Sequence, residues 1–217
     1  MKTIYSILVV ALLTVSIQAQ NFEEAMQKGL TDFQNAKGPE EMIAVANYFE
    51  RISSAEPEEW LPSYYSSYIF TILCFMTDDL AEKEIFLDKA QQSLDIAMKI
   101  DSKNSEIHTM QGMLYQAYIG LDPAANGMIY SGKARTSFEF AKKYDATNPR
   151  PVYLQALSVM HTPAQFGGGK DVACPMFTQA AGMFESFEPS SAIVPNWGKE
   201  DCEKYLGQCG DVADAKQ

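Results

Sequence analysis

The sequence predicts an all-α protein. It should form a right-handed superhelical stack of about four antiparallel helix pairs, with long loops inside the pairs and a C-terminal capping segment. Apolar residues recur every three or four positions in each long segment, which is the spacing of a helix with one apolar face. No stretch alternates with the period of two that is typical of strands. One helix pair cannot bury its own apolar face, so the pairs must stack.

An internal repeat supports the stack. Ala90, Ala134 and Ala173 are each followed four residues later by Leu or Phe, and three residues after that by another Ala. A small residue at a helix crossing allows close approach. We therefore expect second helices over 83–100, 133–144 and 171–187, first helices over 60–76, 105–119 and 152–162, and a weaker first pair that begins over 22–35. The three anchors lie 44 and 39 residues apart, and this spacing predicts loops over 77–80, 120–131 and 162–170.

Gly112 and Tyr115 on a first helix, together with the alanine pattern on the second, resemble the tetratricopeptide repeat, whose period is about 34 residues. A longer series of motifs resembles a family of exported tetratricopeptide proteins of Bacteroidetes-type bacteria: DP at 122–123, NPR at 148–150, TPAQFGGGK at 162–170 and PNWGK at 195–199. This resemblance implies the fold and export but no particular activity. The Gly-Gly-Lys loop before an alanine-rich helix is more faintly similar to helical periplasmic components of substrate-binding transport systems.

The N-terminus predicts export. Residues 1–19 combine Lys2, an apolar run and a small residue, Ala19, at a suitable cleavage position, which indicates a secretory signal peptide. A membrane anchor is the alternative, but a span needs about twenty apolar residues. We expect a periplasmic or secreted protein with no stable membrane insertion after cleavage. Residues 20–194 should form the repeat domain, and residues 195–217 the C-terminal cap and tail.

Charge and motif content exclude several functions. The net charge of −11 becomes −12 when Lys2 is removed, and no Lys/Arg cluster is present, so nucleic acid is an unsuitable partner. The glycines before Lys170 lack the spacing of a phosphate-binding loop and indicate a tight turn. His108 and His161 are the two histidines, and neither lies in a metal-ligand motif. We expect no enzyme activity, no catalytic residues, no metal site and no cofactor.

The four cysteines face an oxidising compartment after export. Cys74 and Cys174 lie in apolar helical context and are expected as core residues. Cys202 and Cys209 are seven residues apart, which on a straight helix is about 10.5 Å, beyond the roughly 7 Å that a disulfide spans. A helix break at Gly207 would permit that bridge, so the sequence leaves open whether Cys202 and Cys209 are paired.

The first helix of each pair should line the concave face of the stack. That register assigns the following residues to a binding surface: Tyr64, Tyr65, Tyr68, Glu106, Thr109, Met113, Gln116, Arg150, Tyr153, Leu157 and Met160. Tyrosines supply rigid contact area with one polar group each. We therefore expect a non-enzymatic scaffold that binds an unidentified protein or peptide through this face. The alternative is a small-molecule carrier that is accessory to a transport system, which would need a closed cavity in place of an open groove.

Overall fold

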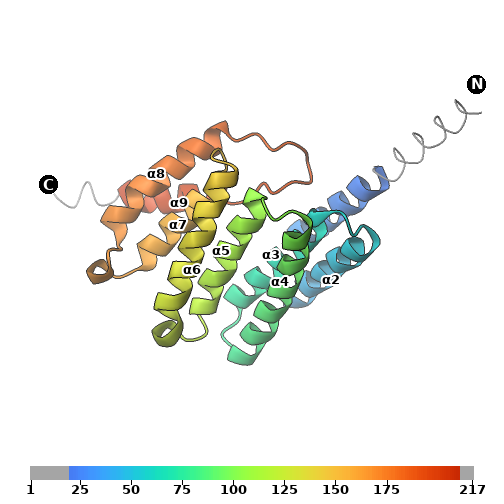
Figure 1. The fold of residues 1–217 in the computed structure, drawn as a ribbon, viewed down its shortest axis with the longest axis horizontal. Coiled ribbons are helices and arrows are strands. Elements are labelled where there is room, and N and C mark those ends of the chain that lie inside the picture. Colours follow the sequence, from blue (N-terminus) through green and yellow to red (C-terminus); the bar gives the residue numbers. More distant parts are fainter. Residues whose placement is uncertain (1–19, 211–217) are drawn as a thin grey trace, which may run out of the picture.

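The computed structural model describes residues 20–210 as stacked antiparallel helix pairs (Figure 1). The pairs are 20–35 with α2 (Pro39–Ala55), α3 (Trp60–Met76) with α4 (Leu80–Ile100), α5 (Ser105–Ile119) with α6 (Pro123–Tyr144), and α7 (Arg150–His161) with α8 (Lys170–Ser186). A short 3-10 turn, η1 (Ala164–Phe166), precedes α8, and α9 (Lys199–Gly210) ends the described chain. Residues 20–210 contain no strand. The predicted all-helical repeat stack is confirmed, whereas the expected signal peptide at 1–19 lies outside the described residues.

The helices form two layers. The first helices α3, α5 and α7 contact one another in sequence, and each second helix packs against the first helix of its own pair. The turns within the pairs α3–α4, α5–α6 and α7–α8 therefore lie along one edge of the stack, the lower edge in Figure 1. We call this the intra-pair edge, and the opposite edge, with the α4–α5 and α6–α7 turns, the inter-pair edge. No helix within residues 20–210 combines the length and apolar content that a membrane span requires.

Side-chain caps set several helix starts. Asp79, Asn104 and Asp122 each accept two backbone N–H groups at the beginning of α4, α5 and α6, which satisfies amides that have no partner within the helix. The predicted long loop over 120–131 is wrong for this reason. Asp122 caps α6 and Pro123 occupies its first turn, so α6 begins about three turns earlier than expected.

The third loop is a turn, as expected. Gly167 and Gly169 adopt positive φ angles of 83° and 103°, which side chains with a Cβ rarely tolerate. Between them they reverse the chain from η1 into α8.

The predicted close approach inside the α5–α6 pair is present. Ala134 is 2% exposed, and Gly112 lies directly under the ring of Phe138. A Cβ on Gly112 would stand 2.2 Å from Cε1 of that buried ring. The contact therefore requires glycine, and Phe138 fills the space that the missing side chain leaves.

We expect Gly112→Ala to lower the free energy of unfolding by about 1–3 kcal/mol, because the added methyl group overpacks the α5–α6 contact. Gly127→Ala on α6 is the matched control. Its Cβ would meet nothing within 4 Å, and the helix propensity of alanine predicts no loss of stability. Denaturant unfolding of both variants measures the difference, and equal stability of the two would contradict the assigned register.

Candidate functional site

A segment of the chain itself crosses the concave face. Residues 187–198, here called the strap, leave α8 and run toward α3 before α9 begins (Figure 1, orange loop). The Tyr65 hydroxyl donates to the carbonyl of Ile193 at 2.8 Å, and the Trp197 indole N–H donates to the Tyr64 hydroxyl at 2.9 Å. The Trp197 ring also stacks on Tyr68 with centroids 5.0 Å apart. The first helices therefore bind a peptide segment in cis.

The strap changes the status of the predicted binding residues. Seven of them are buried, with at most 9% exposure: Tyr64, Tyr65, Tyr68, Thr109, Met113, Arg150 and Tyr153. The other four are partly buried: Glu106, Gln116, Leu157 and Met160. The first seven side chains therefore do not belong to an open surface. The strap contacts five of them: Tyr64, Tyr65, Tyr68, Arg150 and Tyr153. The helical register alone could not show that the C-terminal segment folds back.

Arg150 connects the strap to the inter-pair edge. Its guanidinium is fully buried, and Nη1 lies 2.9 Å from Oε1 of Glu106. Nη2 donates to the carbonyl of Pro195, and the group also lies over the rings of Phe187 and Trp197, 4.8 Å and 5.5 Å from their centroids. The sequence assigned Arg150 to the binding surface of the concave face. In the structure its charge is already matched by a carboxylate 44 residues earlier in the chain.

The carboxyl group of Glu106 has a raised pKa and one oxygen without a hydrogen-bond partner within the described chain. Burial, with a smaller contribution from the charge of Asp145, raises the pKa of its carboxyl group from 4.5 to about 7 against the opposing effect of Arg150. Oε1 accepts from Asn148 and Arg150. Oε2 is buried and has no hydrogen-bond partner within the described chain. A buried acceptor without a hydrogen bond lowers the stability of the fold unless a donor reaches it.

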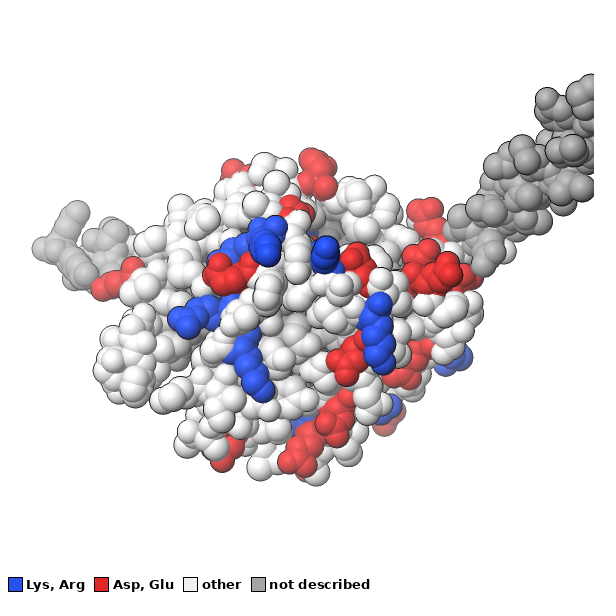
Figure 2. Space-filling view, in the orientation of Figure 1, with Lys and Arg blue, Asp and Glu red and all other residues white. Residues whose placement is uncertain are grey.

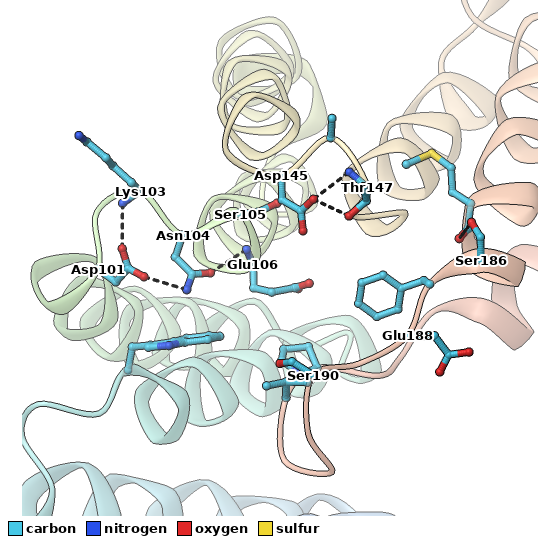
Figure 3. A pocket seen from close by; sticks show the side chains of 16 residues that line it. Asp101, Lys103, Asn104, Ser105, Glu106, Asp145, Thr147, Ser186, Glu188 and Ser190 are labelled. Atoms are coloured by element: carbon cyan, nitrogen blue, oxygen red, sulfur yellow. Dashed lines mark hydrogen bonds between the residues drawn. The ribbon is translucent and has the colours of Figure 1, made fainter.

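A pocket of about 980 Å³ opens beside Glu106 at the inter-pair edge (Figure 3). The start of α3, the α4–α5 turn, the α6–α7 turn and the end of α8 with the strap all contribute to its walls. Apolar lining comes from Trp60, Met183, Phe187, Val194 and Pro195, and charged lining comes from Asp101, Lys103, Glu106, Asp145 and Glu188. Its volume is at the upper end of the range for small-molecule sites, which is about 300–1,000 Å³.

The disulfide differs from the one considered from the sequence. Cys174 on α8 is bonded to Cys209 on α9, with Cα atoms 5.7 Å apart, while Cys202 is buried as a free thiol beside the carbonyl of Phe177. The Cys202–Cys209 pairing fails because α9 continues through Gly207 without a break. Cys174 is therefore a cross-link and not the core thiol that was expected, whereas Cys74 is buried as expected.

The intra-pair edge is more apolar than the pocket at the inter-pair edge. Most of the exposed large apolar side chains of residues 20–210 lie near it: Phe75, Met76, Leu80, Ile85, Met128, Ile129, Phe166 and Val172. Met128 is 91% exposed and Phe166 is 75% exposed. The surface over the α5–α6 and α7–α8 turns, at the lower left of Figure 2, carries few charged side chains. An apolar edge of this kind marks an interaction surface more often than a plain solvent-facing one.

Both histidines contact aromatic side chains. The His108 ring lies near Phe140 and Tyr144, and its Nε2 is 3.0 Å from the carbonyl of Ser102. His161 is exposed at the end of α7 and meets the edge of the Tyr205 ring. The described residues contain no group of three or more His, Cys, Asp or Glu side chains arranged to hold a metal ion.

The chain is thus a tetratricopeptide-like helical-repeat protein whose concave face is covered by its own C-terminal strap. No protein-family model and no curated protein sequence matches it. The solved structures to which it is similar include the following two. The HusA haemophore from Porphyromonas gingivalis is 28% identical with a TM-score of 0.78, over 88% of this chain and 94% of the haemophore. A thermophilic tetratricopeptide protein of Thermus thermophilus is 15% identical with a TM-score of 0.54, over 91% of this chain and 95% of that protein.

We predict that wild-type protein is relatively more stable at low pH than Glu106→Gln. A carboxyl group whose folded-state pKa is raised binds its proton more tightly when folded. Its contribution to stability is fully present below the unfolded pKa of about 4.3 and is lost as pH rises through about 7. Thermal midpoints of both proteins at pH 5 and pH 8 measure this. A wild-type advantage that is the same at both values would show that the carboxyl group titrates normally.

We also expect mass spectrometry of the non-reduced protein to recover one cross-linked peptide pair that contains Cys174 and Cys209. Cys202 and Cys74 should react with an alkylating reagent only after unfolding, because both are buried. Cys209→Ser should destabilise the fold by about 2–4 kcal/mol through loss of the 35-residue cross-link. Recovery of a Cys202–Cys209 peptide would refute the assigned pairing.

Proposed function

We propose that the protein is a non-enzymatic, exported carrier of a porphyrin of the haem type, acting in the periplasm or as a secreted protein. The observation that supports this most is the similarity to a haemophore over nearly the whole length of both chains. The Thermus protein supports the fold alone. The small-molecule carrier, which was the alternative from the sequence, thereby becomes the preferred function.

The intra-pair edge suits such a ligand. A porphyrin is a broad, flat and mostly apolar ring, and burying apolar surface contributes about 25 cal/mol per Å². Met128 and Ile129 on α6 and Phe166 in η1 present exposed apolar area on two successive helix pairs of this edge. Methionine side chains adapt to irregular partners. Lys170, at the start of α8, supplies an ammonium group at the same edge for the ring's carboxylates.

Ring contact should supply most of the affinity, in preference to ligation by two histidines. The two histidines are 53 positions apart, and the His108 ring is already engaged near the inter-pair edge. His161 at the end of α7 is the histidine on the apolar edge. A porphyrin without iron should therefore bind nearly as well as haem.

A peptide-binding scaffold, the first expectation from the sequence, has less support. The concave face that would receive a peptide holds the strap, which is anchored by Tyr65, Arg150 and Trp197. A partner segment would have to displace these contacts and expose a buried guanidinium, which is unfavourable without a replacement partner.

Absorbance and tryptophan-fluorescence titrations with haemin and with protoporphyrin IX test the proposal. We expect saturable binding of both, and about tenfold or weaker affinity when Phe166→Ser and Met128→Ser are combined, which corresponds to about 1.4 kcal/mol. The control is Ile96→Ser, which removes a 45% exposed apolar side chain near the inter-pair edge and should change affinity less than twofold. Absence of binding, or equal losses in the control and the double variant, would overturn the proposal.

A further inference from the structure

We propose that the pocket at the inter-pair edge is a second, separate binding site for a small organic cation, an ammonium group carried on a flat apolar body. The ammonium would lie between the carboxylates of Glu106 and Asp145, and the apolar body would lie against the wall formed by Trp60, Phe187 and Pro195. This site does not depend on the porphyrin proposal, because it is at the opposite edge of the stack.

The two carboxylates face the same space. Glu106 extends from the start of α5 toward the strap, and Asp145 projects from the α6–α7 turn toward the same pocket (Figure 3). They are close enough for the charge of Asp145 to raise the pKa of Glu106. Like charges that are held together in this way repel, and a cation between them removes the repulsion.

Acceptor capacity remains on both groups. Asp145 uses Oδ1 to accept both the backbone N–H and the hydroxyl of Thr147. Glu106 uses Oε1 for Asn148 and Arg150, while Oε2 has no partner within the described chain. Glu106 lines the pocket and its side chain is 14% exposed, although Oε2 itself is buried. An ammonium group has three donors for these oxygens.

Charge decides between a cation and an anion. Asp101, Asp145 and Glu188 carry three negative charges, and Glu106 is partly ionised near neutral pH because its pKa is about 7. Lys103 and the adjacent Arg150 carry two positive charges, so the pocket is negative overall. Porphyrin carboxylates would be repelled here, which separates this pocket from the apolar edge. A metal ion is also a poor occupant, because the described residues contain no group of three or more His, Cys, Asp or Glu side chains that could hold one.

The aromatic and apolar lining of the pocket favours an organic cation over an inorganic one. Trp60 and Phe187 are only partly buried and line the pocket together with Pro195. Aromatic rings bind flat apolar groups by area and bind ammonium groups through the ring face. A ligand that combines both features uses the whole lining, whereas inorganic cations use only the carboxylates.

Three compounds with one ring system and different charge test the site. Tryptamine carries an ammonium group, tryptophol is its neutral counterpart, and indole-3-acetate is an anion. Chemical-shift titrations of the full mature protein should show that tryptamine binds at least about tenfold more tightly than tryptophol, with indole-3-acetate not binding. The shifts should centre on the Trp60 indole and the amides of residues 101–106 and 145–147. Equal binding of tryptamine and tryptophol, or no binding of tryptamine, would overturn the proposal.

Two variants test the carboxylates. Asp145→Asn keeps an acceptor for Thr147 but removes the charge, and should weaken tryptamine binding about fivefold to tenfold. The matched control is Asp79→Asn, an aspartate that caps α4 at the intra-pair edge, which should leave the affinity within twofold of wild type. Thermal melts establish that both variants are folded. Equal affinity of both variants would contradict the proposal. Should Asp145→Asn fail to fold, Glu188→Gln on the strap takes its place and is expected to weaken binding in the same direction.

Discussion

A single buried cation organises the C-terminal half of the molecule. Arg150 is fully buried, and a guanidinium in that position requires a partner for its charge. Glu106 supplies that charge, the carbonyl of Pro195 accepts from Nη2, and the rings of Phe187 and Trp197 lie against the group, whereas Nε has no hydrogen-bond partner within the described chain. Separating the partners of a buried ion pair leaves an uncompensated buried charge, which disfavours other arrangements of Glu106 and the strap. Here the arrangement selected is the strap lying across the first helices.

That arrangement gives the two edges of the stack different surfaces. At the inter-pair edge the strap and the turns enclose a negative pocket with aromatic walls. At the intra-pair edge of the described chain nothing folds back over the turns, so large apolar side chains such as Phe166 and Met128 remain in solvent. On the concave face, the strap contacts Tyr64, Tyr65, Tyr68 and Arg150. A ligand that approaches the molecule therefore meets one edge or the other, and the chemistry of the two edges favours different ligands.

The helices and their pairing could be predicted from the sequence, because apolar spacing and the alanine anchors are local signals. The expected first helices 60–76 and 105–119 coincide with α3 and α5. The start of α6 was missed although Asp122 followed by Pro123 is a recognisable cap, since the repeat pattern there begins only at Ala134. The strap could not be predicted. Its contacts join residues such as Tyr65 and Ile193 that are 128 positions apart, and nothing in the local pattern at 187–198 indicates which face it covers. The Cys174–Cys209 pairing depends on the same fold-back and was missed for the same reason.

Hydroxyl-radical footprinting with mass spectrometry tests the covered concave face most directly, because it reports side-chain exposure in solution. Tyr64 and Tyr65 are 0% and 4% exposed, whereas Met128 and Phe166 are 91% and 75% exposed. The account predicts that the two tyrosines are strongly protected and that Met128 and Phe166 are oxidised rapidly. It also predicts that Trp197→Ala, which removes the strap's stacking contact with Tyr68, releases the protection of the tyrosines. Rapid oxidation of Tyr64 and Tyr65 in the wild-type protein would contradict the account, because it would mean that the concave face is open.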